Sequence, residues 1–390
     1  MYPDNSNLAL RRRPPVRRET YLDWNATAPL RPEAAEAMSA VLARCGNASS
    51  VHRWGRAARQ TVERARDSVA ALLGNAGSEG VIFVSGGTEA NHLALLGAGR
   101  ARILVSAVEH DSVRHAVPGC GTIPVKRDGI VALDALDRLL AADGRPALVS
   151  VMYANNETGV IQPVADIAAV AHEHGALFHC DAVQGAGKLP LRVEEIGADL
   201  VSLSAHKLGG PPGIGALVVK REFDLAPLFR GGSQERGRRA GTENLPGIAG
   251  FGAAATAALA DIAVYDRIRA LRDQLEKEIA ETPDAVVLGA GAPRLPNTTA
   301  IAMPGVSAET QVIALDLDGV MVSSGAACSS GKVGPSHVLA AMRVGSELAG
   351  STIRVSLGWN STEEDIAHFL LAWTALYRRR RGITAGARAA

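Results

Sequence analysis

Through the middle of the chain, short apolar runs alternate with longer helical segments. The runs VIFV (residues 81–84) and ALVSVM (147–152), for example, are each followed by a turn and then by a helical or Ala-rich stretch. Strands that are apolar along their whole length are buried on both faces, and strands that alternate with helices pair in parallel. The sequence therefore predicts an α/β fold built on a mainly parallel sheet. Further strands are expected at residues 103–105, 176–180, 200–203 and 213–219.

The pattern changes after about residue 245. A long helix is predicted over residues 246–281, where Leu271, Leu275 and Ile279 recur at steps of four. Shorter elements follow it: strands at 299–302, 320–322 and 353–356, and helices at 309–317, from 337, and at 363–377. Such a mixture is typical of a smaller α+β domain. We expect a large domain over residues 33–255, a small domain built from residues 19–32 and 256–390, and a disordered basic tail at residues 1–18.

Composition excludes some classes of protein. The 390 residues are 47% hydrophobic, which is enough for two domains. With 41 basic and 40 acidic side chains, the net charge of +1 gives no reason to expect nucleic acid or a membrane as partner. No apolar run approaches the roughly 20 residues of a membrane helix, and the first 18 residues lack the apolar centre of a signal peptide. We expect a cytoplasmic protein.

Polar residues follow several of the predicted strands at the point where each strand ends. Thr88 follows the run at 81–84, and His110, Asn156, Asp181 and Lys207 follow later ones. In an open α/β sheet, ligands bind at the carboxyl ends of the strands. Unrelated polar residues would scatter over both edges, so this segregation predicts a binding site.

Two of these residues suit an aldehyde cofactor with a pyridine ring. Lys207 lies between a predicted strand and a Gly-rich turn, where its amine could form an imine, although a lysine at a strand end is more often a solvated surface charge. Asp181 could neutralise a protonated pyridine nitrogen, which keeps the ring an electron sink. Alternatively, Asp181 is a helix cap.

A phosphate group could bind at the segment SGGTE (residues 85–89). A helix that begins there offers free backbone N–H groups, the Thr88 hydroxyl and the positive end of its dipole. The alternative is an ordinary Gly-rich turn with Thr88 as the helix cap. Ser204 and His206, beside Lys207, could donate further hydrogen bonds to the phosphate.

The four cysteines, Cys45, Cys120, Cys180 and Cys328, form no CxxC pair, which argues against a disulfide framework or a zinc site. Cys328 stands in the loop SSGAACSSG (323–331), which is bare of bulky side chains. A thiolate there could act as a nucleophile. The other three are expected to be small buried hydrophobes, as free cysteines usually are.

Motifs that run in order from about residue 20 to 377 resemble the cysteine desulfurases of the class V aminotransferase fold type, in the NifS/IscS-like subgroup with a long cysteine loop. The matching segments are YLDWNATAP (21–29), NASSVH (47–52), SGGTE (85–89), EH (109–110), NNETG (155–159), HCDAVQ (179–184), SAHK (204–207), GGSQER (231–236), RAGT (239–242), SSGAAC (323–328) and IRVSLG (353–358). The resemblance implies a pyridoxal-phosphate enzyme of fold type I, with a seven-stranded sheet in the large domain. Gly87 stands where alanine is common in the family, and the residues before 19 lie outside the resemblance.

The resemblance also implies roles for the matching residues. Lys207 would be the Schiff-base lysine, His110 would stack on the ring and move protons, and Cys328 would accept the sulfur. Arg354 would bind the substrate carboxylate, with Asn156 also contacting the substrate. The implied cofactor contacts are Asp181 to the pyridine nitrogen, Asn156 and Gln184 to the phenolic oxygen, and Gly87, Thr88, Ser204 and His206 to the phosphate, with Thr242 reaching in from the second subunit of a homodimer.

The expected reaction converts L-cysteine to L-alanine and transfers the sulfur, as a Cys328 persulfide, to an acceptor such as an iron–sulfur scaffold protein or a sulfur carrier. No resident metal is expected, although Cys328 could ligate an iron–sulfur cluster transiently. Alternatives on the same fold are an aminotransferase or a selenocysteine lyase, and a non-catalytic binding protein. The loop around Cys328 argues against an aminotransferase. The joint presence of Lys207, Asp181 and Cys328 argues against a non-catalytic protein.

Overall fold

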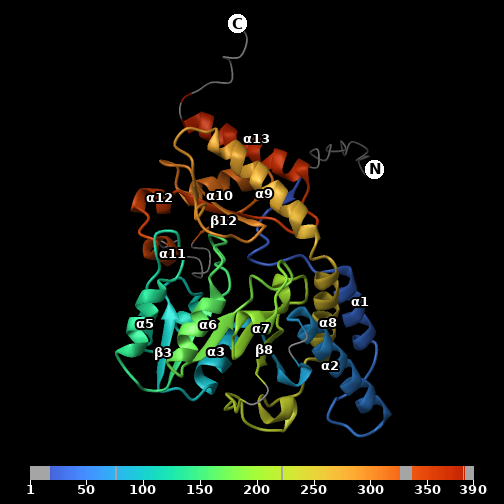
Figure 1. Ribbon diagram of the computed structural model, residues 1–390. Helices are drawn as coiled ribbons and strands as arrows, with labels where there is room; N and C mark the ends of the chain where they lie inside the picture. Colours follow the sequence, from blue (N-terminus) through green and yellow to red (C-terminus); the bar gives the residue numbers. More distant parts are fainter. Residues whose placement is uncertain (1–17, 75–76, 221–222, 326–335, 381, 383–390) are drawn as a thin grey trace, which may run out of the picture.

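The computed structural model describes residues 18–74, 77–220, 223–325, 336–380 and 382. A seven-stranded sheet, lower in Figure 1, has the strand order β2-β8-β7-β6-β5-β3-β4. Only β8 runs antiparallel to its neighbours, so the prediction of a mainly parallel sheet is confirmed. The strands are β2 (Val81–Val84), β3 (Arg102–Ser106), β4 (Gly121–Ile123), β5 (Ala147–Met152), β6 (Leu177–Asp181), β7 (Leu200–Ser204) and β8 (Gly215–Val219).

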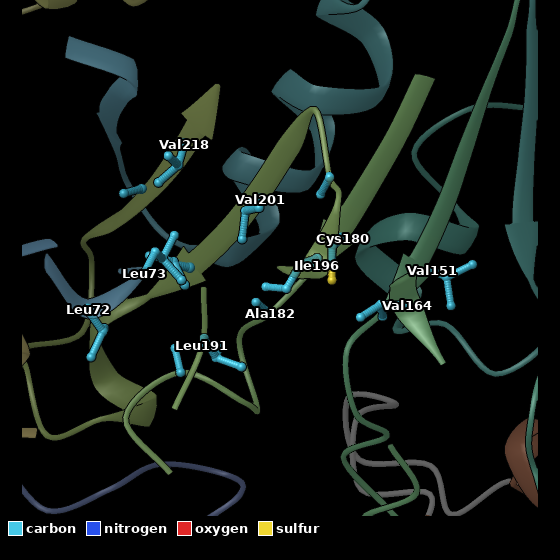
Figure 2. Packing of buried hydrophobic residues seen from close by; sticks show 14 of the residues in the cluster. Leu72, Leu73, Val151, Val164, Cys180, Ala182, Leu191, Ile196, Val201 and Val218 are labelled. Atoms are coloured by element: carbon cyan, nitrogen blue, oxygen red, sulfur yellow. The ribbon is translucent and has the colours of Figure 1, made fainter. Parts of the chain in front are cut away.

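Both faces of this sheet are buried, and alternate residues of each strand supply the two cores. In β2, Ile82 and Val84 belong to a cluster with Leu93 of α3, whereas Phe83 belongs to a larger cluster on the opposite face. Figure 2 shows this larger cluster, to which successive strands contribute Val151, Cys180, Val201 and Val218. Because side chains alternate across a strand, a strand buried on both faces must be apolar throughout.

Helices cover the sheet on both sides. The α3 side of the sheet carries the smaller cluster, and α2, α5, α6 and α8 contribute to the larger one. The helices of this part are α1 (Pro32–Leu42), α2 (Arg53–Leu72), α3 (Gly87–Gly97), α4 (Asp111–Arg114), α5 (Leu133–Ala141), α6 (Val164–Glu173), α7 (Val193–Ile196) and α8 (Leu245–Ala260), with 3₁₀ turns η1 (Ser78–Gly80), η2 (Ala205–Lys207) and η3 (Gln234–Gly237).

A second sheet lies above the first in Figure 1 and is antiparallel, in the order β12-β13-β10-β9. Its own core includes Leu275, Ile353, Phe369 and Trp373. The strands are β9 (Val286–Leu288), β10 (Thr298–Ala302), β12 (Ser323–Ser324) and β13 (Thr352–Ser356), and β1 (Thr20–Tyr21) pairs separately with β11 (Val320–Met321). The helices are α9 (Val264–Ala280), α10 (Ala308–Leu317), α11 (His337–Ala341), α12 (Ser346–Gly350) and α13 (Glu363–Arg380).

The prediction of one helix over residues 246–281 is wrong. Two helices, α8 and α9, meet at a bend of 73°. The two belong to different cores: Phe251 of α8 packs in the larger cluster of the first sheet, and Leu275 of α9 packs in the core of the second sheet. At the break, the Asp261 carboxylate forms an ion pair with Arg31 at 2.6 Å. A straight helix could not reach both cores.

Among the described helices, none is by itself long and apolar enough to cross a membrane. The bent pair α8 and α9 would pass that test together, judged by length and composition alone.

Residues 25–31 run between the two sheets. The Asn25 backbone N–H donates to Ser356 Oγ of β13 at 3.0 Å. Three residues later, the Ala28 N–H donates to the His206 carbonyl at 2.9 Å, and the Arg31 N–H donates to the Gly209 carbonyl at 2.8 Å. Residues 25–31 are thereby fixed against the carboxyl end of β7.

Candidate active site

A cavity of about 370 Å³ lies at the carboxyl ends of the parallel strands. Nearly all the site residues predicted from the sequence line it: Gly87, Thr88, His110, Asn156, Asp181, Gln184, Ser204, His206, Lys207 and Arg354. Thr242 does not; it is exposed and lines a different pocket, with Ser85 and Gly213. Cys328 falls outside the described residues.

Some residues of the cavity were not predicted. Asn25 and Ala26 line it, as do Asn91 and Ser112. None of them directly follows a strand of the large sheet, so the strand-end argument could not find them. Asn91 lies one helical turn after Thr88 on α3, a spacing that places both residues on the same side of a helix. That spacing was the available signal.

Lys207 enters the cavity from the 3₁₀ turn η2, directly after β7. Its Nζ donates to the backbone carbonyls of Asn25 at 2.6 Å and of Ala26 at 2.8 Å. The amine is half-buried and held by the N-terminal segment, so its position depends on residues 181 and 182 positions earlier in the chain.

Asp181 is the last residue of β6 and is only 7% exposed. Its Oδ2 accepts a hydrogen bond from Asn91 Nδ2 at 2.8 Å, and its Oδ1 accepts one from the Val183 N–H at 3.0 Å. Among the described residues, no cationic side chain forms an ion pair with it. A buried carboxylate without a cation is costly, so Asp181 suits a positively charged group that enters the cavity.

His110 caps the short helix α4. Its Nδ1 accepts the backbone N–H of Ser112 at 3.1 Å and lies 2.8 Å from Ser112 Oγ. Because a backbone N–H can only donate, Nδ1 is unprotonated in this arrangement and the neutral ring carries its proton on Nε2. His110 therefore has a fixed tautomer, with its one N–H at Nε2.

An anion-binding end of the cavity is formed by the start of α3. Gly87 and Thr88 begin this 11-residue helix, whose first N–H groups have no partner within the helix. Ser204 and His206 line the same cavity. Burial, with Lys207 and Lys188 nearby, lowers the pKa of His206 to about 4, so at neutral pH this ring is an uncharged donor.

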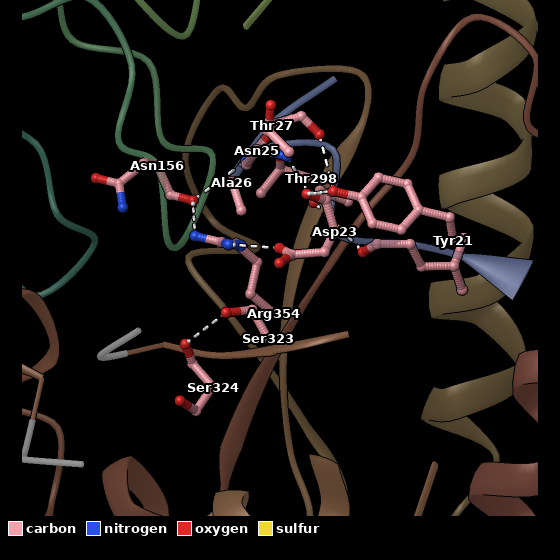
Figure 3. Close-up of polar contacts among 12 residues, drawn as sticks. Tyr21, Asp23, Asn25, Ala26, Thr27, Asn156, Thr298, Ser323, Ser324 and Arg354 are labelled. Carbon is pink, nitrogen blue, oxygen red and sulfur yellow. Dashed lines mark hydrogen bonds and ion pairs between the residues drawn. The ribbon is translucent and has the colours of Figure 1, made fainter. Parts of the chain in front are cut away.

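Arg354 of β13 is buried beside Asp23 and Asn156 (Figure 3). Its Nη2 forms an ion pair with Asp23 Oδ1 at 2.6 Å, and its Nη1 donates to the Asn156 carbonyl at 3.2 Å. Its buried Nε has no hydrogen-bond partner among the described residues. The guanidinium is thus held at the cavity by two partners, and a planar cation with several donors suits an incoming carboxylate.

The cysteines differ from one another in exposure. Cys180 is buried, as predicted, and burial with the nearby Asp181 and Glu109 carboxyl groups raises the pKa of its thiol well above the ordinary value. The prediction is wrong for Cys45, which is exposed because it lies beyond the end of α1, in the connection to α2. Cys120 is half-buried. No group of His, Cys, Asp and Glu side chains in the described ranges could hold a metal ion.

These features fit pyridoxal phosphate. The cavity volume is within the range of about 300–1,000 Å³ usual for cofactor sites. Its walls carry a buried unpaired carboxylate for the ring nitrogen, a helix N-terminus for the phosphate and an amine for the aldehyde. Lys207, Asp181 and the Gly87-Thr88 turn are the residues that would hold the group.

Comparison with known proteins identifies the family. The model of the family Aminotransferase class-V matches residues 20–369. The cysteine desulfurase of Cereibacter sphaeroides is 45% identical over 365 residues, which cover 90% of this chain and 93% of that protein. The cysteine desulfurase IscS of Dictyoglomus turgidum is 42% identical over 91% of this chain and 93% of its own length.

Among solved structures, a NifS-like protein from Rickettsia africae superposes with a TM-score of 0.87 and 37% identity, covering 92% of this chain and 99% of that one. The sequence relatives and the similar solved structure therefore both agree with a cavity that fits pyridoxal phosphate. The chain belongs to the class-V aminotransferase family, in which these two relatives are cysteine desulfurases.

Proposed function

We propose that the protein is a pyridoxal-phosphate-dependent cysteine desulfurase, which converts L-cysteine to L-alanine and transfers the sulfur through Cys328 to an acceptor. The observation that carries the proposal is the single cavity in which Lys207, Asp181 and Arg354 meet. The test is incubation of the holoenzyme with L-cysteine, with alanine and sulfide both quantified. Equimolar alanine and reducible sulfur are expected. Transamination with a keto acid and no release of sulfur would instead make it an aminotransferase.

When bound, pyridoxal phosphate supplies an aldehyde that captures the substrate amino group and a ring that withdraws electrons from Cα. The protein's part is to position the substrate and to move protons. Arg354 binds the α-carboxylate with its planar donors. Lys207 Nζ takes the α-proton, and the carbonyls of Asn25 and Ala26, at 2.6 and 2.8 Å, stabilise the ammonium ion that results.

The sulfur step follows from the chemistry of a thiolate. The Cys328 thiolate attacks the sulfur of the bound substrate, so that an S–S bond forms as the substrate's Cβ–S bond breaks. The electron pair of the broken bond stays on the alanine carbon skeleton. The carbon skeleton takes up a proton to complete alanine, and His110, which lines the same cavity, takes part in this step as proton donor or acceptor.

The persulfide on Cys328 then passes to an acceptor protein. We propose an iron–sulfur scaffold or a sulfur carrier, and hence a role in iron–sulfur cluster assembly. Support comes from the similarity to IscS and NifS-like proteins. Sulfur transfer from a pulse-labelled enzyme to candidate scaffold proteins tests this step.

We also propose that the active enzyme is a homodimer. Thr242 is the phosphate ligand expected from a second subunit, and in the single chain it lies outside the cavity. A surface cavity between α1 and α2 is lined by Val41, Ala57 and a 57% exposed Trp54, with Arg44 and Arg53 beside them, and an exposed tryptophan in such a hollow is typical of a surface that a subunit interface covers. Sedimentation at micromolar concentration should show a dimer. A fully active monomer would contradict the proposal.

Arg354→Lys should reduce kcat/KM for cysteine although it keeps the charge. Lysine cannot form the two-pronged contact, and the loss should amount to about 1–3 kcal/mol, or roughly 5- to 150-fold. Steady-state kinetics with cysteine and with cysteamine, which lacks the carboxylate, measure the effect. Arg267→Lys, at an exposed site on α9 away from the cavity, serves as the matched control. Wild-type kinetics in Arg354→Lys, or equal activity on cysteamine, would count against this role.

A further inference from the structure

A second lysine lies directly behind the cavity. Lys188 is only 2% exposed, and its Nζ donates to Gln184 Oε1 at 2.7 Å and to Asn25 Oδ1 at 3.2 Å. Both acceptors are neutral amide oxygens, and within the described ranges no carboxylate forms an ion pair with this amine. Burial lowers the pKa of Lys188 well below its ordinary value, and the nearby charges of Lys207 and Arg354 act in the same direction. The two hydrogen bonds to Gln184 and Asn25 are the polar contacts that hold this amine among the described residues.

Those two hydrogen bonds help to hold both amides in place. The Nε2 group of Gln184 donates to the Asn25 carbonyl at 3.0 Å, and Lys188 donates to its Oε1. The Oδ1 of Asn25 accepts from Lys188 and also from Asn297 Nδ2 at 3.2 Å, while its Nδ2 group donates to the Asn156 carbonyl at 3.1 Å and to Thr298 Oγ1 at 2.9 Å. Without Lys188, the buried Oε1 of Gln184 would lose its donor, and this side chain would be held only through Nε2.

The same network reaches the reactive amine. Gln184 and Asn25 both line the cavity, whereas Lys188 does not. The Asn25 carbonyl that accepts from Gln184 also accepts from Lys207 Nζ at 2.6 Å. A displacement of Asn25 or Gln184 would therefore change both the donor that Gln184 offers to the cavity and the resting position of Lys207.

We propose that Lys188 is a positioning residue: it orients the side-chain amides of Gln184 and Asn25, and through them the Gln184 donor and the Lys207 amine. The inference rests on the cofactor site of the proposed function but not on its sulfur chemistry. Lys188 does not line the cavity and so does not contact the reacting atoms.

The test is Lys188→Met, which keeps the volume and removes both donors. In the holoenzyme, the pH midpoint at which the cofactor's visible absorption band changes should shift from that of wild type. The dissociation constant for pyridoxal phosphate, measured on the apoenzyme, should rise about tenfold, as expected for the loss of one to two hydrogen bonds. Lys220→Met is the matched control, because Lys220 is 69% exposed and pairs only loosely with Asp199 at 3.6 Å. It should change neither quantity.

A double-mutant cycle distinguishes positioning through Gln184 from a general structural role of Lys188. If Lys188 acts through Gln184, then Lys188→Met should shift the midpoint less in a Gln184→Ala background than in wild type. Lys188→Gln retains an N–H donor and should recover part of the shift. If Lys188→Met does not fold, the pH midpoint and the pyridoxal-phosphate dissociation constant of Lys188→Gln are compared with those of wild type, and a difference in both supports the proposal.

Wild-type midpoints and affinities in folded Lys188 variants, or strictly additive effects with Gln184→Ala, would overturn the proposal. Both readouts use the cofactor alone, with no cysteine. A protein that passes this test but releases no sulfur would contradict the proposed function and leave the role of Lys188 intact.

Discussion

Lys207→Ala is expected to lower kcat for alanine formation by at least about 10³-fold, because it removes the group that takes the α-proton. The cofactor should still bind, without a covalent bond, since Asp181 and the start of α3 remain. Borohydride reduction of the wild-type holoenzyme, followed by peptide mapping, should place the cofactor label on Lys207. Alanine production and the retained cofactor absorbance are the two measurements.

The peptide mapping must distinguish Lys207 from a second lysine near the cavity, Lys188. Lys188 contacts Asn25 and Gln184 beside the cavity, and burial lowers the pKa of its amine well below the ordinary value, which favours the nucleophilic form. Its 2% exposure and its place behind Gln184 should keep it from reacting. A label on Lys188, or on the exposed control Lys220, would reassign the covalent lysine. Substantial turnover by Lys207→Ala would do the same.

Cys328→Ala should reduce both alanine and sulfur release by at least about 100-fold, because the attacking thiolate is lost. It should still bind pyridoxal phosphate and change its absorption when cysteine is added, since capture of the substrate and removal of the α-proton use Lys207. The described flank of the loop supports this role: Ser323 of β12 pairs with Arg354 of β13. Cys328 follows Ser324 by only four positions, at most about 14 Å of extended chain.

Mass spectrometry after a short pulse of cysteine should find one added sulfur on the peptide that contains Cys328. Cys120→Ala is the matched control, since Cys120 is half-buried and does not line the active-site cavity, and its loss should leave turnover unchanged. Cys180 is buried and its thiol has a raised pKa, so little thiolate is available there. Added sulfur on Cys180, or normal turnover by Cys328→Ala, would show that the proposed mechanism is wrong.

The sequence predicted the large sheet well because strands buried on both faces leave an unmistakable apolar pattern. It failed at the bend between α8 and α9, because no Gly or Pro stands at residues 261–263 to mark the break, and the two helices differ only in the core against which each packs. The short strands β1, β4, β9 and β12 were also missed, since two or three residues carry no period. The division into a large domain (33–255) and a small one remains a proposal, which the separate cores of the two sheets support.

At the site, strand ends were the reliable signal, and they located Asp181 and Lys207 correctly. Asn25 and Lys188 could not be found in this way. Both act through contacts between segments that are distant in sequence, such as Asn25 with Thr298 and Lys188 with Asn25. A local sequence pattern does not indicate which distant segments come into contact, so only the three-dimensional structure shows these pairs.

The place of residues 25–31 between the two sheets has a consequence for how the protein is made. The carbonyls that hold Lys207 belong to a segment whose other partner, Ser356, lies 331 positions further along the chain. At synthesis rates of about 5–20 residues per second, the ribosome reaches that partner roughly 15–70 seconds after it has made Asn25. Contacts of such high sequence separation also form late in folding, because the loop-closure entropy must first be overcome. Capture of the cofactor should therefore be one of the last events in biogenesis, and nascent chains that stop before the second sheet should remain colourless.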